Sequence, residues 1–116
     1  MFKAGDVVTI REGLTENTNQ EYIISVVSLF DDRMLYSLRN YQLGRYWSAD
    51  ELVATTKPNH YGVRYCAGDR VIVSATGQID TIQRVCATRL GIQYTLMYDH
   101  QLREQHELTL INYSLF

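Results

Sequence analysis

The residues with the clearest chemical potential are aromatic and basic, and many of them gather in the first half of the chain. Nine tyrosines stand among the 116 residues, and RYWSADEL at 45–52 places an arginine, a tyrosine and a tryptophan before an acidic pair. Aromatic rings provide large contact area, stack on nucleobases and attract cations. We therefore predict recognition by contact, with these candidate binding residues: Tyr22, Tyr36, Arg39, Tyr41, Arg45, Tyr46, Trp47 and Asp50.

Covalent and metal chemistry find little support in the sequence. Cys66 and Cys86 are the only cysteines, and without a CxxC or a cysteine–histidine cluster they are predicted to be reduced thiols buried in strands. His60, His100 and His106 lack the spacing of a zinc site and are predicted to be exposed turn residues. There is no GxSxG motif and no Walker loop. We expect no enzymatic activity, no metal and no cofactor.

The charge of the chain bears on nucleic-acid binding. A formal net charge of −2 and a pI near 5.8 provide no overall basic field for the phosphate backbone. A local basic track is available from Arg33, Arg39, Arg45 and Arg64. Arginines interleave there with Tyr41 and Tyr46, as base stacking would require. The competing interpretation is a set of solvated hairpin arginines paired with Asp31, Asp32 or Glu51.

An internal repeat organises the sequence. FKAGDVVTI at 2–10 matches YCAGDRVIV at 65–73, since both run from an aromatic residue through Ala-Gly-Asp into an apolar segment. Two further pairs are MLYSL at 34–38 with IQYTL at 92–96, and DEL at 50–52 with HEL at 106–108. We therefore expect two copies of one small module.

Short strands are predicted in each copy. Gly-Asp is a turn signal, and the runs that follow it are rich in β-branched and aromatic residues. The expected strands are 6–11, 21–30, 33–40, 44–48 and 52–55 in the first copy, and 69–74, 79–87, 90–98, 101–104 and 108–112 in the second. TTKPNHYG at 55–62 holds the only proline and is the predicted linker. Ser48 is expected to cap a single helical turn over 49–51.

The order of these features resembles the SH3-like barrel superfamily, and more narrowly its Tudor and KOW-type members. The matching residues are Phe2, Gly5, Asp6 and Val8, then Tyr46, Trp47 and Leu52. The second copy departs from the pattern, because QLREQHEL at 101–108 has Arg103 and Glu104 nearest to the place of the aromatic pair. The resemblance implies an all-β fold of two tandem five-stranded SH3-like barrels packed together. Their expected bounds are 1–56 for barrel 1, 57–64 for the linker and 65–116 for barrel 2.

The resemblance also implies a class of function. Tudor-like proteins hold methylated lysine or arginine in aromatic cages, and Asp50 or Glu51 would be the acidic residue of such a cage here. SH3-like barrels also present edges and loops to protein partners. We expect a non-enzymatic protein–protein interaction module, an adaptor or inhibitor that occupies a surface of its partner. The alternative is a KOW/Tudor-type nucleic-acid-binding module that uses the Arg/Tyr surface of barrel 1.

The two ends of the sequence bear on location and assembly. MFKAGDVVTI lacks the apolar core of a signal peptide, and no window has the length and apolarity of a membrane span, so we expect a cytoplasmic protein. Small tandem modules of this kind are typical of phage and mobile-element genomes. The apolar YSLF at 113–116 is expected to pack on barrel 2 or against another chain, which makes a homodimer one candidate assembly.

Overall fold

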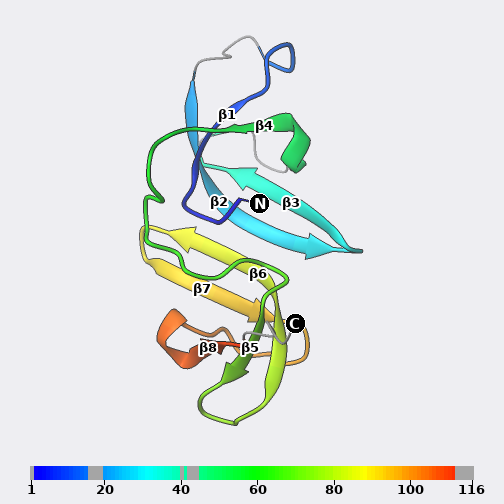
Figure 1. Cartoon of the computed structure of the whole chain (residues 1–116), viewed down its shortest axis with the longest axis vertical. Coiled ribbons are helices and arrows are strands. Elements are labelled where there is room, and N and C mark those ends of the chain that lie inside the picture. Colours follow the sequence, from blue (N-terminus) through cyan, green and yellow to red (C-terminus); the bar gives the residue numbers. More distant parts are fainter. Residues whose placement is uncertain (1, 16–19, 40, 42–44, 112–116) are drawn as a thin grey trace, which may run out of the picture.

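The computed structural model describes residues 2–15, 20–39, 41 and 45–111, and it confirms the all-β class (Figure 1). The strands are β1 Val7–Ile10, β2 Glu21–Phe30, β3 Arg33–Leu38, β4 Leu52–Ala54, β5 Arg70–Val73, β6 Ile79–Thr88, β7 Gly91–Leu96 and β8 Leu108–Leu110. Two single helical turns, η1 Ala49–Glu51 and η2 Gln105–Glu107, precede β4 and β8. All pairings are antiparallel and form one eight-stranded sheet. No helix in the described ranges has the length and apolarity to cross a membrane.

The strands pair in the same way in two halves of the chain, which we call the first half (β1–β4 with η1) and the second half (β5–β8 with η2). In each half, the first strand pairs with the second and the fourth, and the second pairs with the third. The two Ala-Gly-Asp turns make the same backbone hydrogen bond between equivalent atoms. Gly5 N–H donates to Ile24 O and Gly68 N–H donates to Ile82 O, both at 2.7 Å. The repeat in the sequence therefore corresponds to a repeat in the backbone hydrogen bonds.

Alternation along the strands places the apolar side chains inside. Val8 and Ile10 of β1 are almost completely buried, and so are Val71 and Val73 of β5. Residues between them, such as Ile72, are partly exposed, as the two-residue period of a strand requires. These side chains belong to one core that both halves share, and it forms from the faces that the sequence pattern indicated.

Three sequence predictions about strands are wrong. Within the described part of 44–48 and in 101–104, the structure has only the isolated bridges Tyr36–Trp47 and Tyr94–Arg103. Pairing stops there because the next residue is already the N-cap of η1 or η2. Cys66 does not lie in a strand either. Its N–H donates to the Asp69 carboxylate at 2.8 Å, so it belongs to the turn that precedes β5.

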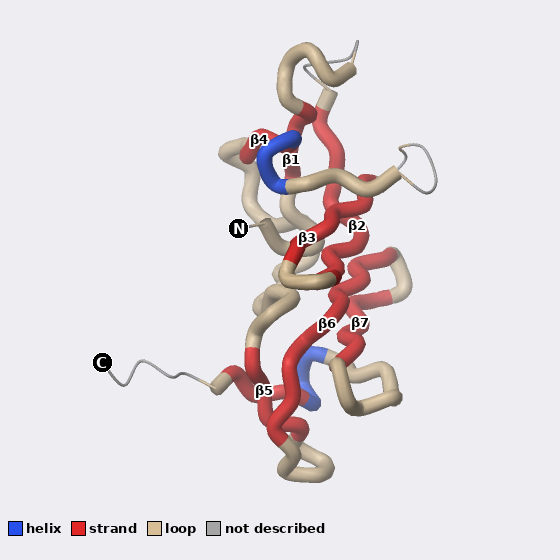
Figure 2. The backbone as a smooth tube through the Cα atoms, turned by 90° about the vertical axis from the view of Figure 1, so that its right-hand side faces the viewer, coloured by secondary structure: helices blue, strands red, loops and turns tan. Residues whose placement is uncertain are grey.

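The two halves join where β2 pairs with β6. The register places Val27 opposite Val85, with Val26 opposite Cys86 and Ser28 opposite Arg84. Val27 and Val85 occupy equivalent places, since Val27 also pairs with Tyr36 as Val85 pairs with Tyr94. An approximate two-fold axis therefore passes between them, and the β2–β3 and β6–β7 hairpins extend to opposite sides of the molecule (Figure 1). Seen from the side, β2 and β6 follow one another along the long axis (Figure 2).

The predicted linker is tied to the first half through Asn59. Its amide nitrogen donates to Ala4 O at 2.9 Å and to the Asp6 carboxylate at 2.8 Å. Its amide oxygen accepts the N–H groups of Tyr61 and Val63, each at 3.1 Å. The linker is thus fixed by hydrogen bonds to the turn that begins β1.

The matched glycines Gly5 and Gly68 provide a test of this contact. Both have positive φ, 90° and 94°, so an alanine at either place should lose about 1–2 kcal/mol through backbone strain. A Cβ at Gly5 would also lie 2.5 Å from Asn59 Oδ1, whereas one at Gly68 would meet Met34 Cε at 3.4 Å and Leu29 Cδ2 at 3.9 Å, which are ordinary contacts. We expect Gly5→Ala to lose about 1–3 kcal/mol more than Gly68→Ala in urea unfolding, because the Asn59 hydrogen bonds must shift. Equal losses would show that Asn59 does not fix the turn.

Candidate functional site

Three of the predicted binding residues come together as a packed aromatic cluster. Tyr41 contacts both Tyr22 and Trp47 edge to face, with ring centroids 5.4 Å apart in each pair. Tyr22 is 6% exposed and Trp47 is 1% exposed. The indole nitrogen of Trp47 is buried and has no hydrogen-bond partner among the described residues. The cluster therefore belongs mainly to the core of the first half.

Arg45 covers this cluster. Its guanidinium carbon lies 4.1 Å from the centroid of the Trp47 ring, and its Nη2 pairs with Glu51 at 3.4 Å. A cation over a tryptophan face is the interaction that an aromatic cage offers to a methylated ligand. Here the protein's own arginine provides that cation, so a methylated ligand would have to displace Arg45 and its ion pair.

The other four predicted binding residues do not join the cluster. Tyr36 is buried and stacks edge to face on Phe2 at 5.6 Å, and burial raises the pKa of its hydroxyl. Arg39 lies over the Tyr61 ring at 5.0 Å and donates to Ala87 O at 3.2 Å. Tyr46 and Asp50 are exposed. The expected single surface of eight residues is therefore divided among core, inter-half contacts and solvent.

The predicted helical turn over 49–51 is confirmed, and carboxylates hold it. The Ser48 N–H donates to Glu51 Oε1 at 3.0 Å, and the Ser48 hydroxyl lies within hydrogen-bond distance of the Asp50 and Glu51 carboxylates, which share its one proton. The hydrogen bond from Ser48 lowers the pKa of Asp50. Glu51 thus serves both the turn and Arg45, which orients the guanidinium over Trp47.

In the second half, charged residues occupy the positions that are equivalent to Tyr22 and Trp47. Asp80 pairs with Val71 as Tyr22 pairs with Val8, and Arg103 bridges Tyr94 as Trp47 bridges Tyr36. Arg103 is 9% exposed and pairs with Asp99 at 2.7 Å and Glu107 at 3.3 Å. An ionic network thus replaces the aromatic cluster, and among the described residues of the second half no cation lies over a ring at this place.

The two cysteines are not activated as nucleophiles, and the three histidines lie on the surface. Cys66 is buried and Cys86 is half-buried; both are free, and burial raises the pKa of each thiol, which disfavours the nucleophilic thiolate. The three histidines are exposed, as predicted. Glu104, His106 and Glu107 lie within reach of one ion, but Glu107 is already paired with Arg103. Exposed acidic groups of this kind do not define a metal centre.

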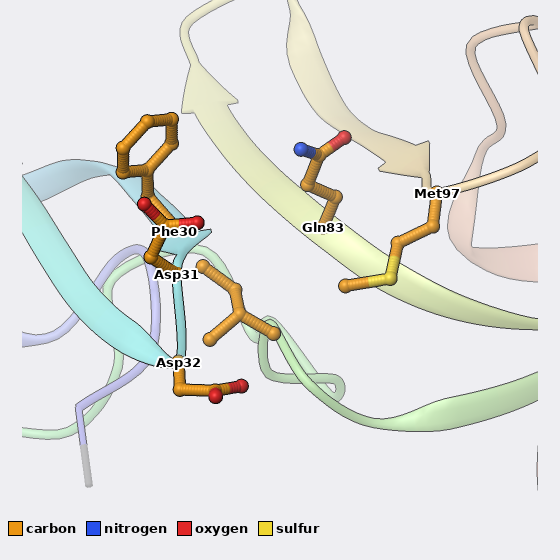
Figure 3. Close-up of a pocket in the computed structure, with 6 residues that line it drawn as sticks. Phe30, Asp31, Asp32, Gln83 and Met97 are labelled. Carbon is orange, nitrogen blue, oxygen red and sulfur yellow. The ribbon is translucent and has the colours of Figure 1, made fainter.

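A groove that the sequence did not reveal lies where the two halves meet. It has a volume of about 410 Å³. We call it the hairpin groove, and its lining residues are Leu29, Phe30, Asp31, Asp32, Gln83 and Met97. Figure 3 shows the β2–β3 turn on one side, with Gln83 and Met97 facing it from the second half. A second hollow of about 230 Å³ shares Leu29, Phe30 and Gln83, so the concave surface extends along β2 and β6.

The hairpin groove combines exposed apolar surface with negative charge. Phe30 is 62% exposed and Met97 is 39% exposed. Asp31 and Asp32 form the turn with φ of 48° and 62°, a conformation that aspartate tolerates better than most residues. Within the described residues, neither carboxylate has an ion-pair partner, so the arginine pairing considered for them from sequence does not occur there. The FDDR sequence indicates the turn, but no local signal indicates that Met97 lies opposite.

Comparison with known proteins identifies no relative of this chain. No family model, no curated protein and no solved structure matches the chain. Function is therefore inferred from the side chains described above.

Trp47 and Tyr46 provide a matched test of where the aromatic residues act. Trp47→Ala removes a ring that is 1% exposed and should lower the free energy of unfolding by about 3–5 kcal/mol. Tyr46→Ala removes a ring that is 51% exposed and should change it by less than about 1 kcal/mol. Urea unfolding followed by circular dichroism measures both. A Trp47→Ala variant with wild-type stability would contradict a core position for the ring.

Asp99 should make stability depend on pH. The hydrogen bond from Arg103 lowers the pKa of Asp99, so its contribution is complete above the unfolded pKa of about 3.9 and is lost as the pH falls through the folded pKa. We expect Asp99→Asn to be less stable than wild type at pH 7, with the difference shrinking below about pH 4. Urea unfolding from about pH 3 to pH 7 measures this. A difference that is independent of pH would show that the ion pair does not stabilise the fold.

Proposed function

We propose that the chain is a non-enzymatic, cytoplasmic protein-binding module, an adaptor or inhibitor built from two tandem SH3-like barrels. The proposed barrels span 1–56 and 65–116, joined by 57–64. The repeated pairing of four strands in each half supports this organisation. The bridges at Trp47 and Arg103 support a minimal fifth strand in each barrel.

The hairpin groove carries the functional part of the proposal. Protein-binding sites combine exposed large apolar side chains with a polar rim, and aromatic residues are favoured as anchors. Phe30 and Met97 provide the apolar part, while Asp31 and Asp32 provide the rim. An open concave surface of this kind suits a peptide segment or a loop better than a small molecule, which would need more complete enclosure.

The arginine contacts support a protein partner over a nucleic acid. Arg45 is engaged with Trp47 and Glu51, and Arg39 is engaged with Tyr61 and Ala87. A phosphate backbone would have to compete with these contacts, in a chain whose net charge is already −2. The aromatic faces needed for base stacking are mainly in the core.

Phe30→Ser changes the hairpin groove, and Tyr46→Ser changes the exposed edge of the first-half aromatic cluster. A capture experiment with both variants shows which of these two surfaces binds a partner. Both rings are more than half exposed, at 62% and 51%, so both variants should fold. Tagged protein is incubated with lysate of the cells that express it, with and without nuclease treatment, and retained proteins are identified by mass spectrometry. We expect a protein that wild type and Tyr46→Ser retain, and that Phe30→Ser binds at least about tenfold more weakly.

Two results would contradict the proposal. A partner lost with Tyr46→Ser but kept with Phe30→Ser would place binding on the exposed edge of the first-half cluster. Capture that disappears on nuclease treatment, and weakens steeply with salt, would favour the nucleic-acid alternative.

A further inference from the structure

The two hairpin turns related by the approximate two-fold axis have opposite chemistry. In the first half the turn between Phe30 and Arg33 consists of Asp31 and Asp32, which we call the acidic turn. In the second half the turn between Thr88 and Gly91 consists of Arg89 and Leu90, which we call the basic turn. Equivalent places in the fold thus present two carboxylates on one side and a cation beside an apolar side chain on the other.

The basic turn is fully presented to solvent. Leu90 is 100% exposed and Arg89 is also exposed. No ion pair of Arg89 occurs within the described part of the chain. The Leu90 N–H donates to Thr88 Oγ1 at 3.2 Å, so the turn is shaped by its own hydrogen bonds while both side chains remain free to bind.

The hairpin groove is complementary to the basic turn. Asp31 and Asp32 provide two unpaired carboxylates for one guanidinium, and Arg–carboxylate pairs are the strongest of the surface ion pairs. Phe30 and Met97 provide apolar surface for a leucine side chain next to that guanidinium. Because the two turns lie on opposite sides of the molecule, a basic turn cannot reach the groove of its own chain (Figure 1).

We propose that the hairpin groove binds the Arg89–Leu90 turn of a second copy of this chain, head to tail. This inference rests on the proposed function, because it names the partner of the same groove. A contact of this kind is heterologous, so each molecule keeps one free groove and one free turn, and association continues into short chains. One turn in one groove buries little area, so the association is weak and depends on concentration.

Sedimentation velocity on the whole chain tests the proposal. We expect the weight-average sedimentation coefficient of wild type to rise between about 10 µM and about 1 mM, as befits a small interface. Arg89→Glu should abolish the rise by placing a like charge against the groove. Asp31→Asn with Asp32→Asn should also abolish it, and asparagine tolerates the positive φ of the acidic turn. Arg64→Glu makes the same charge change at another exposed residue and should leave the rise unchanged.

Mixing the two inactive variants provides the decisive result. Arg89→Glu keeps an intact groove, and the double asparagine variant keeps an intact basic turn. The equimolar mixture should therefore form a one-to-one dimer, although neither variant associates alone, and it should stop at the dimer because no further matched pair remains. A mixture that stays monomeric while wild type associates would assign the association to another interface and overturn the proposal.

The outcomes also separate this proposal from the proposed function. A wild-type chain that stays monomeric up to about 1 mM overturns self-association, even where a different protein is still captured through Phe30. In that case the groove binds a partner other than its own chain. Self-association with the expected pattern, together with the loss of association in Phe30→Ser, supports the proposal whether or not a second protein is captured.

Discussion

The pairing of β2 with β6 is the interaction on which the rest of the structure depends. Val27 and Val85 meet at its centre, and both are fully buried. The buried apolar side chains of both halves form one cluster across this pairing, and each half would bury little surface alone. This pairing also brings Met97 of the second half and the β2–β3 turn of the first half to one concave surface, the hairpin groove. The candidate binding surface therefore exists only where the two halves pair, and neither half contains it alone.

Equivalent positions in the two halves are stabilised by different interactions. In the first half, Trp47 is buried among aromatic rings, and its stabilisation comes from apolar area removed from water. In the second half, Arg103 is nearly as buried and requires two carboxylates to offset the loss of its hydration. Both solutions keep the same backbone bridge to a tyrosine, and burial raises the pKa of the second-half tyrosine, Tyr94, to about 12.

Much of the local structure could be predicted from sequence, because it depends on local patterns. The 21–30 strand matches the structure, and the turn after Ser48 was indicated by its capping residues. The candidate site was harder to predict, because exposure depends on packing between distant segments. Tyr22 and Trp47 look like binding residues by type, yet they face the core. Phe30 and Met97 line one groove because of a strand pairing that no local signal encodes. The predicted apolar tail at 113–116 lies outside the described residues.

Interstrand proton contacts measured by NMR test the central pairing most directly. Facing residues of an antiparallel pair have Cα atoms about 4.5–5.5 Å apart, close enough for nuclear Overhauser effects between their backbone protons. The structure predicts such effects between β2 and β6 in the register Val26–Cys86, Val27–Val85 and Ser28–Arg84. The absence of these contacts, or a register that moves Val27 away from Val85, would contradict the two-fold arrangement and the groove built on it.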